Sequence, residues 1–147
     1  MDEKRVKFVN SVSTLRSAKS LGITVVQGVN ELVDNSVDAG ARSVSIQVMG
    51  LGDGRTRVIV ADDGCGIPES GGDGEPGGIN EALRMGKRIA HRVPSSRQPI
   101  GRYGFGLSLT ASCLSHRTHA YSKTEEGDWR YSYLDIPELE SDGARLP

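Results

Sequence analysis

Apolar side chains recur at helical spacing along residues 23–38, and this periodicity predicts the first clear element of the chain, an α-helix. The apolar positions of this stretch are Val25, Val26, Val29, Leu32, Val33 and Val37. They form a stripe that we expect to pack on a core, whereas Gln27, Glu31 and Asn35 are four residues apart and share the opposite, polar face. Gly40 is suited to end the helix, because glycine readily adopts the left-handed conformation that follows a C-cap.

Strand-like runs, some alternating between apolar and polar residues and one continuously apolar at Val58, Ile59 and Val60, predict two pairs of β-strands. The predicted strands cover residues 43–49, 55–61, 116–123 and 128–135. Two further apolar stretches, 9–20 and 105–115, are predicted as helices. Trp129, Tyr131 and Tyr133 alternate along the last strand and are expected to pack on the sheet rather than to form a base-stacking platform. Segregated strands and helices of these lengths favour an α+β fold, a two-layer α/β sandwich with helices on one face of a sheet.

The first of three short motifs, Glu31-Leu-Val-Asp-Asn35 followed by Asp38-Ala-Gly, lies on the polar side of this first helix. Glu31 and Asn35 are one turn apart and can therefore touch the same ligand. Mg²⁺ prefers hard oxygen ligands, so the Asn35 amide oxygen and phosphate oxygens together would bind it. A carboxylate one turn earlier can orient and deprotonate a water for in-line attack on a terminal phosphate, which makes Glu31 the candidate general base. The alternative is an amphipathic helix with a solvated acidic face.

The second motif, Asp62-Asp-Gly64-Cys-Gly66-Ile67, begins where the second predicted strand ends. A carboxylate at that point can accept a hydrogen bond from an exocyclic amino group, a donor that guanine lacks at the ring position where adenine has it. Asp62 is therefore the candidate that reads the base. We expect Gly64 and Gly66 to let the backbone approach a flat ring and to take positive φ angles. The alternative is an ordinary turn, since Asp and Gly are common in turns.

The third motif, Gly101-x-x-Gly104-x-Gly106, precedes the apolar run of the helix predicted at 105–115. Glycines that open a helix form an anion site, because unpaired backbone N–H groups and the positive end of the helix dipole suit a polyphosphate. The surrounding residues match neither the dinucleotide-binding fingerprint, which needs a strand directly before it, nor the phosphate loop that ends in Gly-Lys-Ser/Thr. The motif therefore indicates a phosphate site of another kind.

In this order the three motifs resemble those of the GHKL ATPases, the superfamily of type II topoisomerase ATPase domains, heat-shock ninety-type chaperones, histidine kinases and mismatch-repair ATPases. The resemblance covers residues 24–123 and is greatest for the hydrolases, including MORC-type proteins, because of Glu31 and the Asp38-Ala-Gly sequence. It implies a Bergerat-type ATP-binding fold with a mixed, mostly antiparallel sheet. It also implies that ATP and Mg²⁺ are bound, with Glu31 as base, Asn35 as Mg²⁺ ligand and Asp38 as a supporting pocket acid. Asp62 would read the adenine.

The resemblance assigns the rest of the pocket to the second and third motifs and to a later strand. Gly64, Gly66 and Ile67 would border the adenine. The phosphates would be lined by Gly101, Gly104, Phe105, Gly106 and Leu107. Family members place a threonine on a strand beneath the adenine, and Ser122 is similar to it in position.

Residues 67–100 separate the second and third motifs and are too many for a plain connection in a compact domain, so we interpret them as an ATP lid. Six cationic and no acidic side chains lie between residues 82 and 102, an excess that attracts a triphosphate. Lys87 is the candidate phosphate contact, and the alternatives for this charge are a solvated basic face or a nucleic-acid patch. The family often has a lysine just after the last glycine of the third motif. This chain has Leu107 and Ser108 there, which makes the phosphate side of the pocket less positive.

The composition agrees with one small domain, since the chain has 147 residues, 36% hydrophobic and 25% charged, with a net charge of −1. We assign residues 1–136 to the ATP-binding domain and the polar residues 137–147 to a tail or a truncated linker to a further domain. No apolar run is long enough for a membrane span and no signal-peptide core is present, so we expect a cytoplasmic protein without a membrane partner. Cys65 and Cys113 are expected to be packing residues.

The expected function is slow, Mg²⁺-dependent ATP hydrolysis that drives a conformational switch. ATP would order the lid and the N-terminal segment and so favour a homodimer, and a client protein or a further domain would receive the signal, while nucleic acid is not indicated as a partner. The alternative is an ATP-sensing interaction module without hydrolysis, which agrees with the absence of a lysine that a second domain supplies in relatives. A protein kinase of the histidine-kinase-like branch is disfavoured by Glu31, which those domains usually lack.

Overall fold

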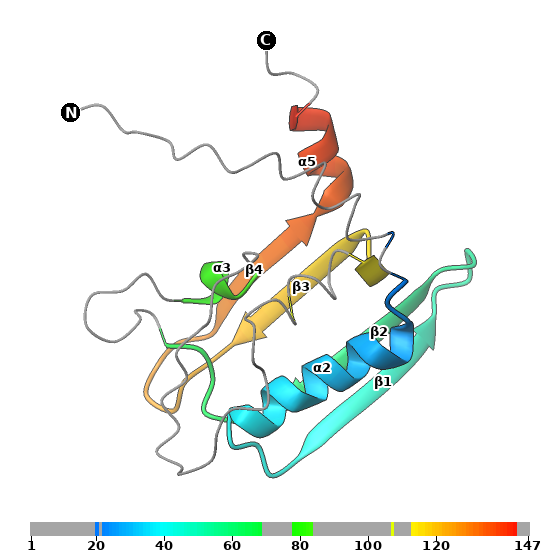
Figure 1. Cartoon of the computed structure of the whole chain (residues 1–147). Coiled ribbons are helices and arrows are strands. Elements are labelled where there is room, and N and C mark those ends of the chain that lie inside the picture. Colours follow the sequence, from blue (N-terminus) through cyan, green and yellow to red (C-terminus); the bar gives the residue numbers. More distant parts are fainter. Residues whose placement is uncertain (1–19, 21, 69–77, 84–106, 108–112, 144–147) are drawn as a thin grey trace, which may run out of the picture.

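The computed structural model describes residue 20, residues 22–68, 78–83 and 107, and residues 113–143. In chain order these residues form the elements labelled in Figure 1: α2 (Val25–Asp38), β1 (Val44–Gly50), β2 (Thr56–Asp62), α3 (Ile79–Ala82), β3 (Arg117–Ser122), β4 (Arg130–Asp135) and α5 (Ile136–Gly143). The helix expected at 9–20 lies outside the described residues. So does most of the helix expected at 105–115, of which Leu107, Cys113 and Leu114 are helical. None of the helices in the described part is long and apolar enough to cross a bilayer.

Helix α2 begins at a capping box and ends at a glycine. The Thr24 hydroxyl accepts a hydrogen bond from the Gln27 backbone N–H (3.2 Å), and the Gln27 side-chain carbonyl accepts one from the Thr24 N–H (2.8 Å). At the other end, Gly40 has a φ of +73° and donates its N–H to the Val37 carbonyl. The helix expected at 23–38 is confirmed, and it begins two residues later than the periodicity indicates.

The apolar stripe of α2 is only partly covered, so the expectation that it packs on a core is wrong at the two ends of the helix. Val25, Val26 and Val37 are 46–69% exposed, whereas the other apolar positions of the stripe are half-buried. The fully buried positions of the helix are Gly28 and Ser36. The most buried positions of α2 are therefore small residues and not its valines.

Strands β1 and β2 form an antiparallel hairpin with Val44 opposite Asp62, which confirms the first predicted pair of strands. The hairpin closes through a hydrogen bond from the Leu51 N–H to the Arg55 carbonyl (2.9 Å). Residues directly opposite each other lie on the same face of a sheet, so Asp62 shares its face with Val44. The contact of Asp62 with Ser36 shows that this is the face covered by α2.

Strands β3 and β4 confirm the second predicted pair, with Tyr121 opposite Tyr131 and His119 opposite Tyr133. The four rings pack along one face with centroids 4.9–6.5 Å apart. The tyrosines are nevertheless 47–66% exposed, and Trp129 is 71% exposed. The histidine and tyrosine rings thus pack on one another, as expected for sheet residues, but no layer of the described structure covers them. Trp129 directly precedes β4 and is not part of the sheet.

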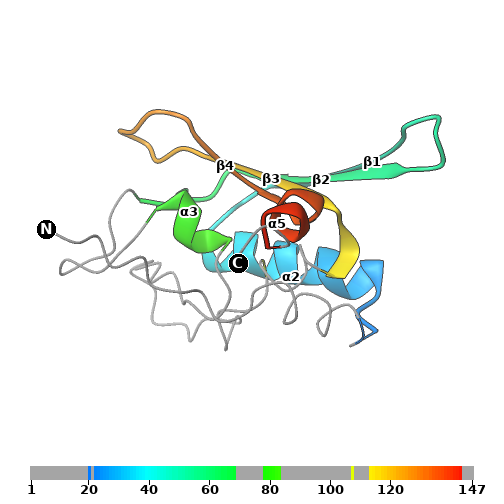
Figure 2. The ribbon, with the colours of Figure 1, turned by 90° about the horizontal axis from the view of Figure 1, so that it is seen from above.

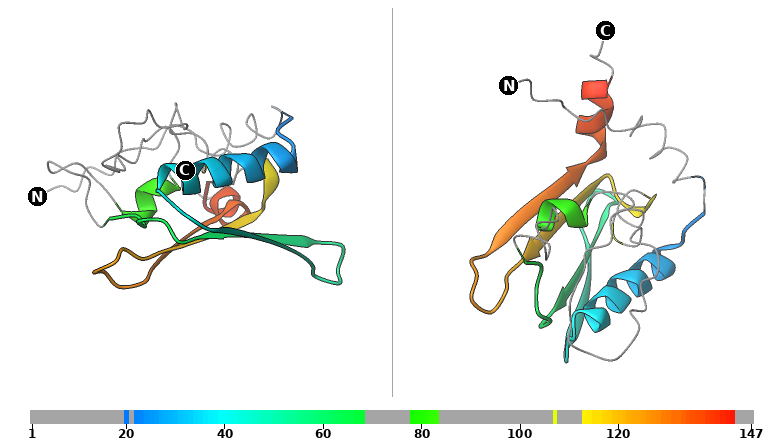
Figure 3. Two further views of the ribbon diagram at one scale, coloured as in Figure 1. Left: turned by 90° about the horizontal axis from the view of Figure 1, so that it is seen from below. Right: turned by 60° about the vertical axis from the view of Figure 1, so that its left-hand side comes forward.

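All four strands lie in one layer, and α2, α3 and α5 lie on the same side of it, as Figures 2 and 3 show. The hydrogen-bonded ladders are β1–β2 and β3–β4. Among the described residues, the buried apolar core consists of Ile79, Ala82, Leu83 and Ile136. The α+β class with helices on one face of the sheet is confirmed, and this arrangement places α2 over the end of β2.

Helix α5 differs from the expectation that a polar tail follows Ile136. Asp135 caps the helix, because its Oδ1 accepts the Glu138 backbone N–H (3.1 Å) while its Oδ2 lies 2.6 Å from Arg117 Nε. Ile136 is 2% exposed and anchors the first turn in the core. The sequence feature that could have predicted this helix is Asp135 followed three residues later by Glu138, which is the spacing of a capping box. The domain boundary expected at residue 136 stays a prediction.

Candidate functional site

The last turns of α2 meet the end of β2 through a hydrogen bond between Ser36 and Asp62. The Ser36 hydroxyl lies 3.0 Å from Asp62 Oδ2 and also 3.0 Å from the Leu32 carbonyl oxygen, one turn earlier. The hydroxyl has a single proton, and the carboxylate is the stronger of the two acceptors. Ser36 is 3% exposed, so water has little access to this contact. The first and second sequence motifs are thus joined directly.

The Asp62 carboxylate is held by two donors and can still be reached from solvent. Its Oδ1 accepts the Gly64 backbone N–H at 2.9 Å, and its Oδ2 faces the Ser36 hydroxyl. Each carboxylate oxygen has a second lone pair that these bonds leave available. Because Asp62 is exposed, a ligand can approach it. An oriented and accessible carboxylate is what recognition of an exocyclic amino group requires.

The two glycines after Asp62 are required for different reasons. Gly66 has a φ of +71°, and a Cβ at this position would overlap the Lys123 carbonyl. Gly64 is not among the glycines with positive φ, so that part of the expectation is wrong. Its constraint is space, because a Cβ there would lie 2.8 Å from both the Ala39 Cβ and Asp62 Oδ1. The loop after β2 therefore lies directly against the turn that follows α2.

Ser122 fixes the same loop from the end of β3. Its hydroxyl oxygen accepts the Ile67 backbone N–H at 2.8 Å, and the residue is 9% exposed. The two residues are 55 positions apart in the sequence. The strand position expected beneath the base is thus in contact with the last residue of the second motif.

Glu31 and Asn35 are exposed on α2, one turn apart, and Asn35 directly precedes Ser36. Asp38, at the end of the helix, is half-buried and has an interaction of its own. An exposed amide oxygen fits Mg²⁺, which completes its coordination with phosphate oxygens and water. No group of three or more His, Cys, Asp or Glu side chains in the described ranges could hold a metal ion. A metal bound at Asn35 would therefore depend on the oxygens of the nucleotide.

A sequence profile of the family described as Histidine kinase-, DNA gyrase B-, and HSP90-like ATPase matches residues 23–146. The chain belongs to this family. The match begins just before α2 and extends beyond α5, so it includes all the helices and strands that the structure describes. The resemblance to the GHKL ATPases, which the three motifs indicate, is thereby confirmed.

Several bacterial proteins named DNA mismatch repair protein MutL are similar to this GHKL chain. The protein of Thermoanaerobacter sp. (strain X514) is 26% identical over 128 residues, which are 86% of the chain and 18% of that protein. The protein of Gemmatimonas aurantiaca is 33% identical over 79 residues, 54% of the chain and 11% of that protein. The protein of Caulobacter vibrioides (strain NA1000 / CB15N) is 51% identical over 39 residues, 26% of the chain and 6% of that protein. The chain thus spans less than a fifth of the length of these relatives.

Part of the GHKL site expected from the sequence lies outside the described residues. This applies to Lys87, Gly101, Gly104, Phe105 and Gly106. Leu107 is a half-buried helical residue. The structure brings together residues of the first motif, the second motif and Ser122, whereas the glycine-rich phosphate site and the lid contact stay predictions.

Two residues of this candidate site were not predicted from the sequence, Ser36 and Asp63. Ser36 directly follows Asn35, the predicted metal ligand. The sequence feature that could have indicated Ser36 is its position, since it is a polar residue on the side of the helix that the periodicity assigns to the core. Asp63 accepts the Arg42 and Ser43 backbone N–H groups at 2.7 and 2.8 Å. These two bonds hold the pKa of the Asp63 carboxyl below its usual value, the bond from Ser43 having the larger effect. No local pattern indicated Asp63, because its partners are 20 and 21 residues away.

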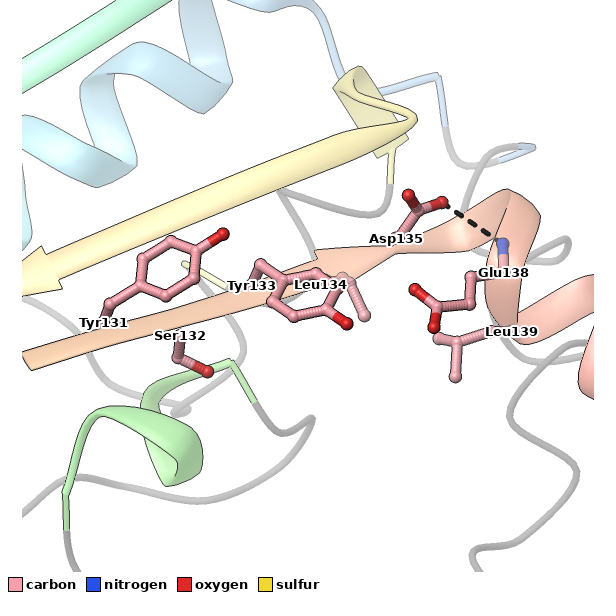
Figure 4. Close-up of a pocket in the computed structure, with 7 residues that line it drawn as sticks. All are labelled: Tyr131, Ser132, Tyr133, Leu134, Asp135, Glu138 and Leu139. Carbon is pink, nitrogen blue, oxygen red and sulfur yellow. Dashed lines mark hydrogen bonds between the residues drawn. The ribbon is translucent and has the colours of Figure 1, made fainter.

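A hollow of about 430 Å³ lies elsewhere, between β4 and α5 (Figure 4). It is lined by Tyr131, Ser132, Tyr133, Leu134, Asp135, Glu138 and Leu139. None of the site residues expected from the three sequence motifs is among these lining residues. The candidate for the nucleotide site is therefore the junction of α2, β2 and β3 and not this hollow.

Gly66→Ala is expected to lower the free energy of unfolding by about 3 kcal/mol, with about 1–2 kcal/mol from the left-handed backbone and the rest from overlap with the Lys123 carbonyl. Urea unfolding followed by circular dichroism measures this change. Gly52→Ala is the matched control, since Gly52 has a φ of +78° but nothing within 4 Å of an added Cβ. It should show the backbone contribution alone. Equal losses for the two variants would contradict the close packing at Gly66.

Proposed function

We propose that this domain binds ATP together with Mg²⁺ and hydrolyses it slowly, and that the bound nucleotide controls closure of the lid and pairing of two copies. The observation that carries this proposal is the Ser36–Asp62 hydrogen bond. It holds the candidate base-reading carboxylate against the helix that carries Glu31 and Asn35, so one nucleotide could contact both. Membership of the ATPase family supports the chemistry.

At the base end, Asp62 would accept a hydrogen bond from the exocyclic amino group of adenine. The Ser36 hydroxyl and the Gly64 N–H keep the carboxylate in one orientation before the ligand arrives. Guanine has a carbonyl oxygen at the corresponding ring position, so two acceptors would face each other without a proton between them. Such an unsatisfied pair costs about 1–3 kcal/mol and would favour ATP over GTP.

At the phosphate end, Mg²⁺ when bound would neutralise phosphate charge, and the Asn35 amide oxygen would hold it there together with phosphate oxygens. Glu31 would orient the attacking water and take its proton while the bond from the water oxygen to the terminal phosphorus forms and the bond from that phosphorus to the β–γ bridging oxygen breaks, with ADP as the leaving group. Both side chains are exposed, so the carboxylate of Glu31 has no burial cost in the free protein. The two residues lie one helical turn apart, so Asn35 could bind the metal ion while Glu31 contacts the attacking water at the same phosphate group.

We propose that the lid, residues 67–100, is anchored to the rest of the domain at two places. Ile79, Ala82 and Leu83 are 5–8% exposed, and α3 packs against β3 and β4. Ile67, where the lid segment begins, is held by Ser122. Nucleotide binding would then order the remainder of the lid and the N-terminal segment, and the ordered parts would pair two copies of the chain.

The relatives are named for DNA mismatch repair. We extend to this chain only ATP-driven switching, because the matched part is 6–18% of their length. A client protein or a further domain would respond to the nucleotide-dependent conformational change.

Calorimetry with a non-hydrolysable ATP analogue, with Mg²⁺ or with EDTA, tests this proposal together with a phosphate-release assay. The wild-type protein should bind the analogue more tightly with Mg²⁺ and release phosphate from ATP. Asn35→Ala should lose about tenfold or more in affinity with Mg²⁺ and little in EDTA, since one metal ligand is removed. Asn30→Ala is the matched control, because Asn30 is exposed on the same helix. Unchanged Mg²⁺ dependence in Asn35→Ala would contradict the metal assignment.

A further inference from the structure

The loop after β2 and the turn after α2 are joined by several hydrogen bonds along their length. The Asp63 N–H donates to the Ser43 carbonyl at 3.3 Å, and the Cys65 N–H donates to the Ala39 carbonyl at 3.0 Å. Asp63 Oδ1 accepts the N–H groups of Arg42 and Ser43 at 2.7 and 2.8 Å. We call this set of bonds the 39–43/63–65 clasp. Its one side-chain member is the Asp63 carboxylate.

The two bonds to Asp63 are the shortest in the clasp, and both are made to a charged acceptor. One carboxylate oxygen receives two successive backbone N–H groups, so it determines the direction in which residues 42 and 43 approach the loop. Asp63 itself is exposed, and both of its side-chain bonds are made to backbone N–H groups of the turn. The contacts of Asp63 therefore fix the position of the backbone and do not contribute to the packing of apolar side chains.

The clasp affects the orientation of the Asp62 carboxylate through Gly64. The Gly64 N–H orients Asp62 Oδ1 at 2.9 Å, and Gly64 lies so close to Ala39 that a Cβ would not fit. Asp63 lies between Asp62 and Gly64 in the chain and ties this short stretch to the turn. A shift of the loop away from the turn would therefore move the donor that orients the Asp62 carboxylate.

We propose that Asp63 is a positioning residue for base recognition: by holding the loop 63–65 to the turn 39–43, it sets the orientation of the Asp62 carboxylate and thereby the preference for adenine over guanine. This inference rests on the proposed function, since it takes Asp62 as the residue that reads the base. Because the turn continues directly from α2, the clasp also keeps the base-reading loop at a fixed distance from the helix of Glu31 and Asn35.

The test compares the ratio of dissociation constants for GTP and ATP among wild type, Asp63→Ala and Asp63→Asn. Asp63→Ala should lower this ratio by about five- to tenfold, because small misplacements of an orienting group weaken its discrimination. Asp63→Asn retains an oxygen that accepts both N–H groups and should restore most of the ratio. A purely structural role would reduce the folded fraction but would leave the ratio in the folded molecules unchanged.

Asp53→Ala is the matched control. Asp53 also accepts a backbone N–H, from Arg55 at 3.0 Å, and is paired with the Arg55 guanidinium, but it lies in the turn between β1 and β2. Its removal should leave the GTP:ATP ratio as in wild type. Hydrogen exchange without nucleotide gives a second readout, in which Asp63→Ala should expose the Arg42 and Ser43 amides and Asp53→Ala should not.

The outcomes separate the two proposals. A lowered ratio in Asp63→Ala with recovery in Asp63→Asn supports the positioning role. A wild-type ratio in Asp63→Ala, with faster exchange at residues 42 and 43, overturns that role while ATP binding stands. Absence of ATP binding by the wild-type protein overturns the proposed function and the inference with it, even where the exchange data show the clasp in solution.

Discussion

Glu31→Gln should bind ATP as tightly as the wild-type protein and hydrolyse it at least about 100-fold more slowly, within the range that a positioned general base contributes. Glutamine keeps the size and the hydrogen-bonding reach of the side chain, but its amide cannot take a proton from water. Glu31 is exposed on α2, so the exchange should leave the fold intact. The loss should therefore appear in turnover and not in affinity.

Single-turnover phosphate release measures the rate, and calorimetry with a non-hydrolysable analogue measures the affinity. Glu125→Gln is the matched control, because Glu125 is an exposed glutamate in the turn between β3 and β4. A mock purification from host cells that lack the protein, made in parallel, reports contaminating ATPase. Equal turnover of Glu31→Gln and wild type, after that contamination is excluded, would refute the catalytic assignment.

Asp62→Asn is expected to weaken the binding of ATP and of ADP by the same factor, about 10- to 100-fold. Hydrogen bonds to charged groups contribute about 1.5–3 kcal/mol, and about 1.4 kcal/mol corresponds to tenfold in affinity. The substitution also replaces one acceptor of the carboxylate by an NH₂ group, which conflicts with a donor on Ser36 or on the base. Since the base is common to both nucleotides, the ATP:ADP ratio should not change.

Fluorescence competition with labelled ADP and unlabelled ATP or ADP gives the two affinities. Asp128→Asn is the control, since Asp128 is exposed in the connection between β3 and β4. Thermal unfolding of each variant shows whether the loss comes from the fold. Undiminished affinity in Asp62→Asn would contradict its role in base recognition, and a loss for ATP alone would move Asp62 to the phosphate end of the ligand.

The elements that could be predicted are those whose signal is local. Helix α2 has its capping residues three positions apart and its terminating glycine directly after it, so a short window contains all that defines its ends. The two hairpins follow from alternating or continuously apolar runs within strands of six or seven residues. Helix α5 was missed although Asp135 and Glu138 have capping spacing, because its first turn is stabilised by burial of Ile136 and by the bond from the Ile136 N–H to the distant His116 carbonyl.

Burial depth was the less predictable property. The periodicity of α2 indicates which positions share a side, but it does not say how far a neighbour covers them. Val25, Val26 and Val37 are therefore largely exposed, and Ser36, which no apolar scale would choose, is the most buried side chain that the helix has. The exposed tyrosines of β3 and β4 show the same effect, since alternation indicates a face without saying what lies against it.

For the site, the sequence by itself determined the residue types and their order: a Glu and an Asn one turn apart on a helix, an Asp at a strand end and glycines after it. These are short-range properties, and the family match spans the residues that carry them. Only the tertiary structure decided that Ser36 meets Asp62, that Ile67 meets Ser122 and that the Asp63 carboxylate binds the turn after α2. These contacts join residues 20 to 55 positions apart. Their existence depends on how the helix lies over the sheet, which no local pattern of side chains encodes.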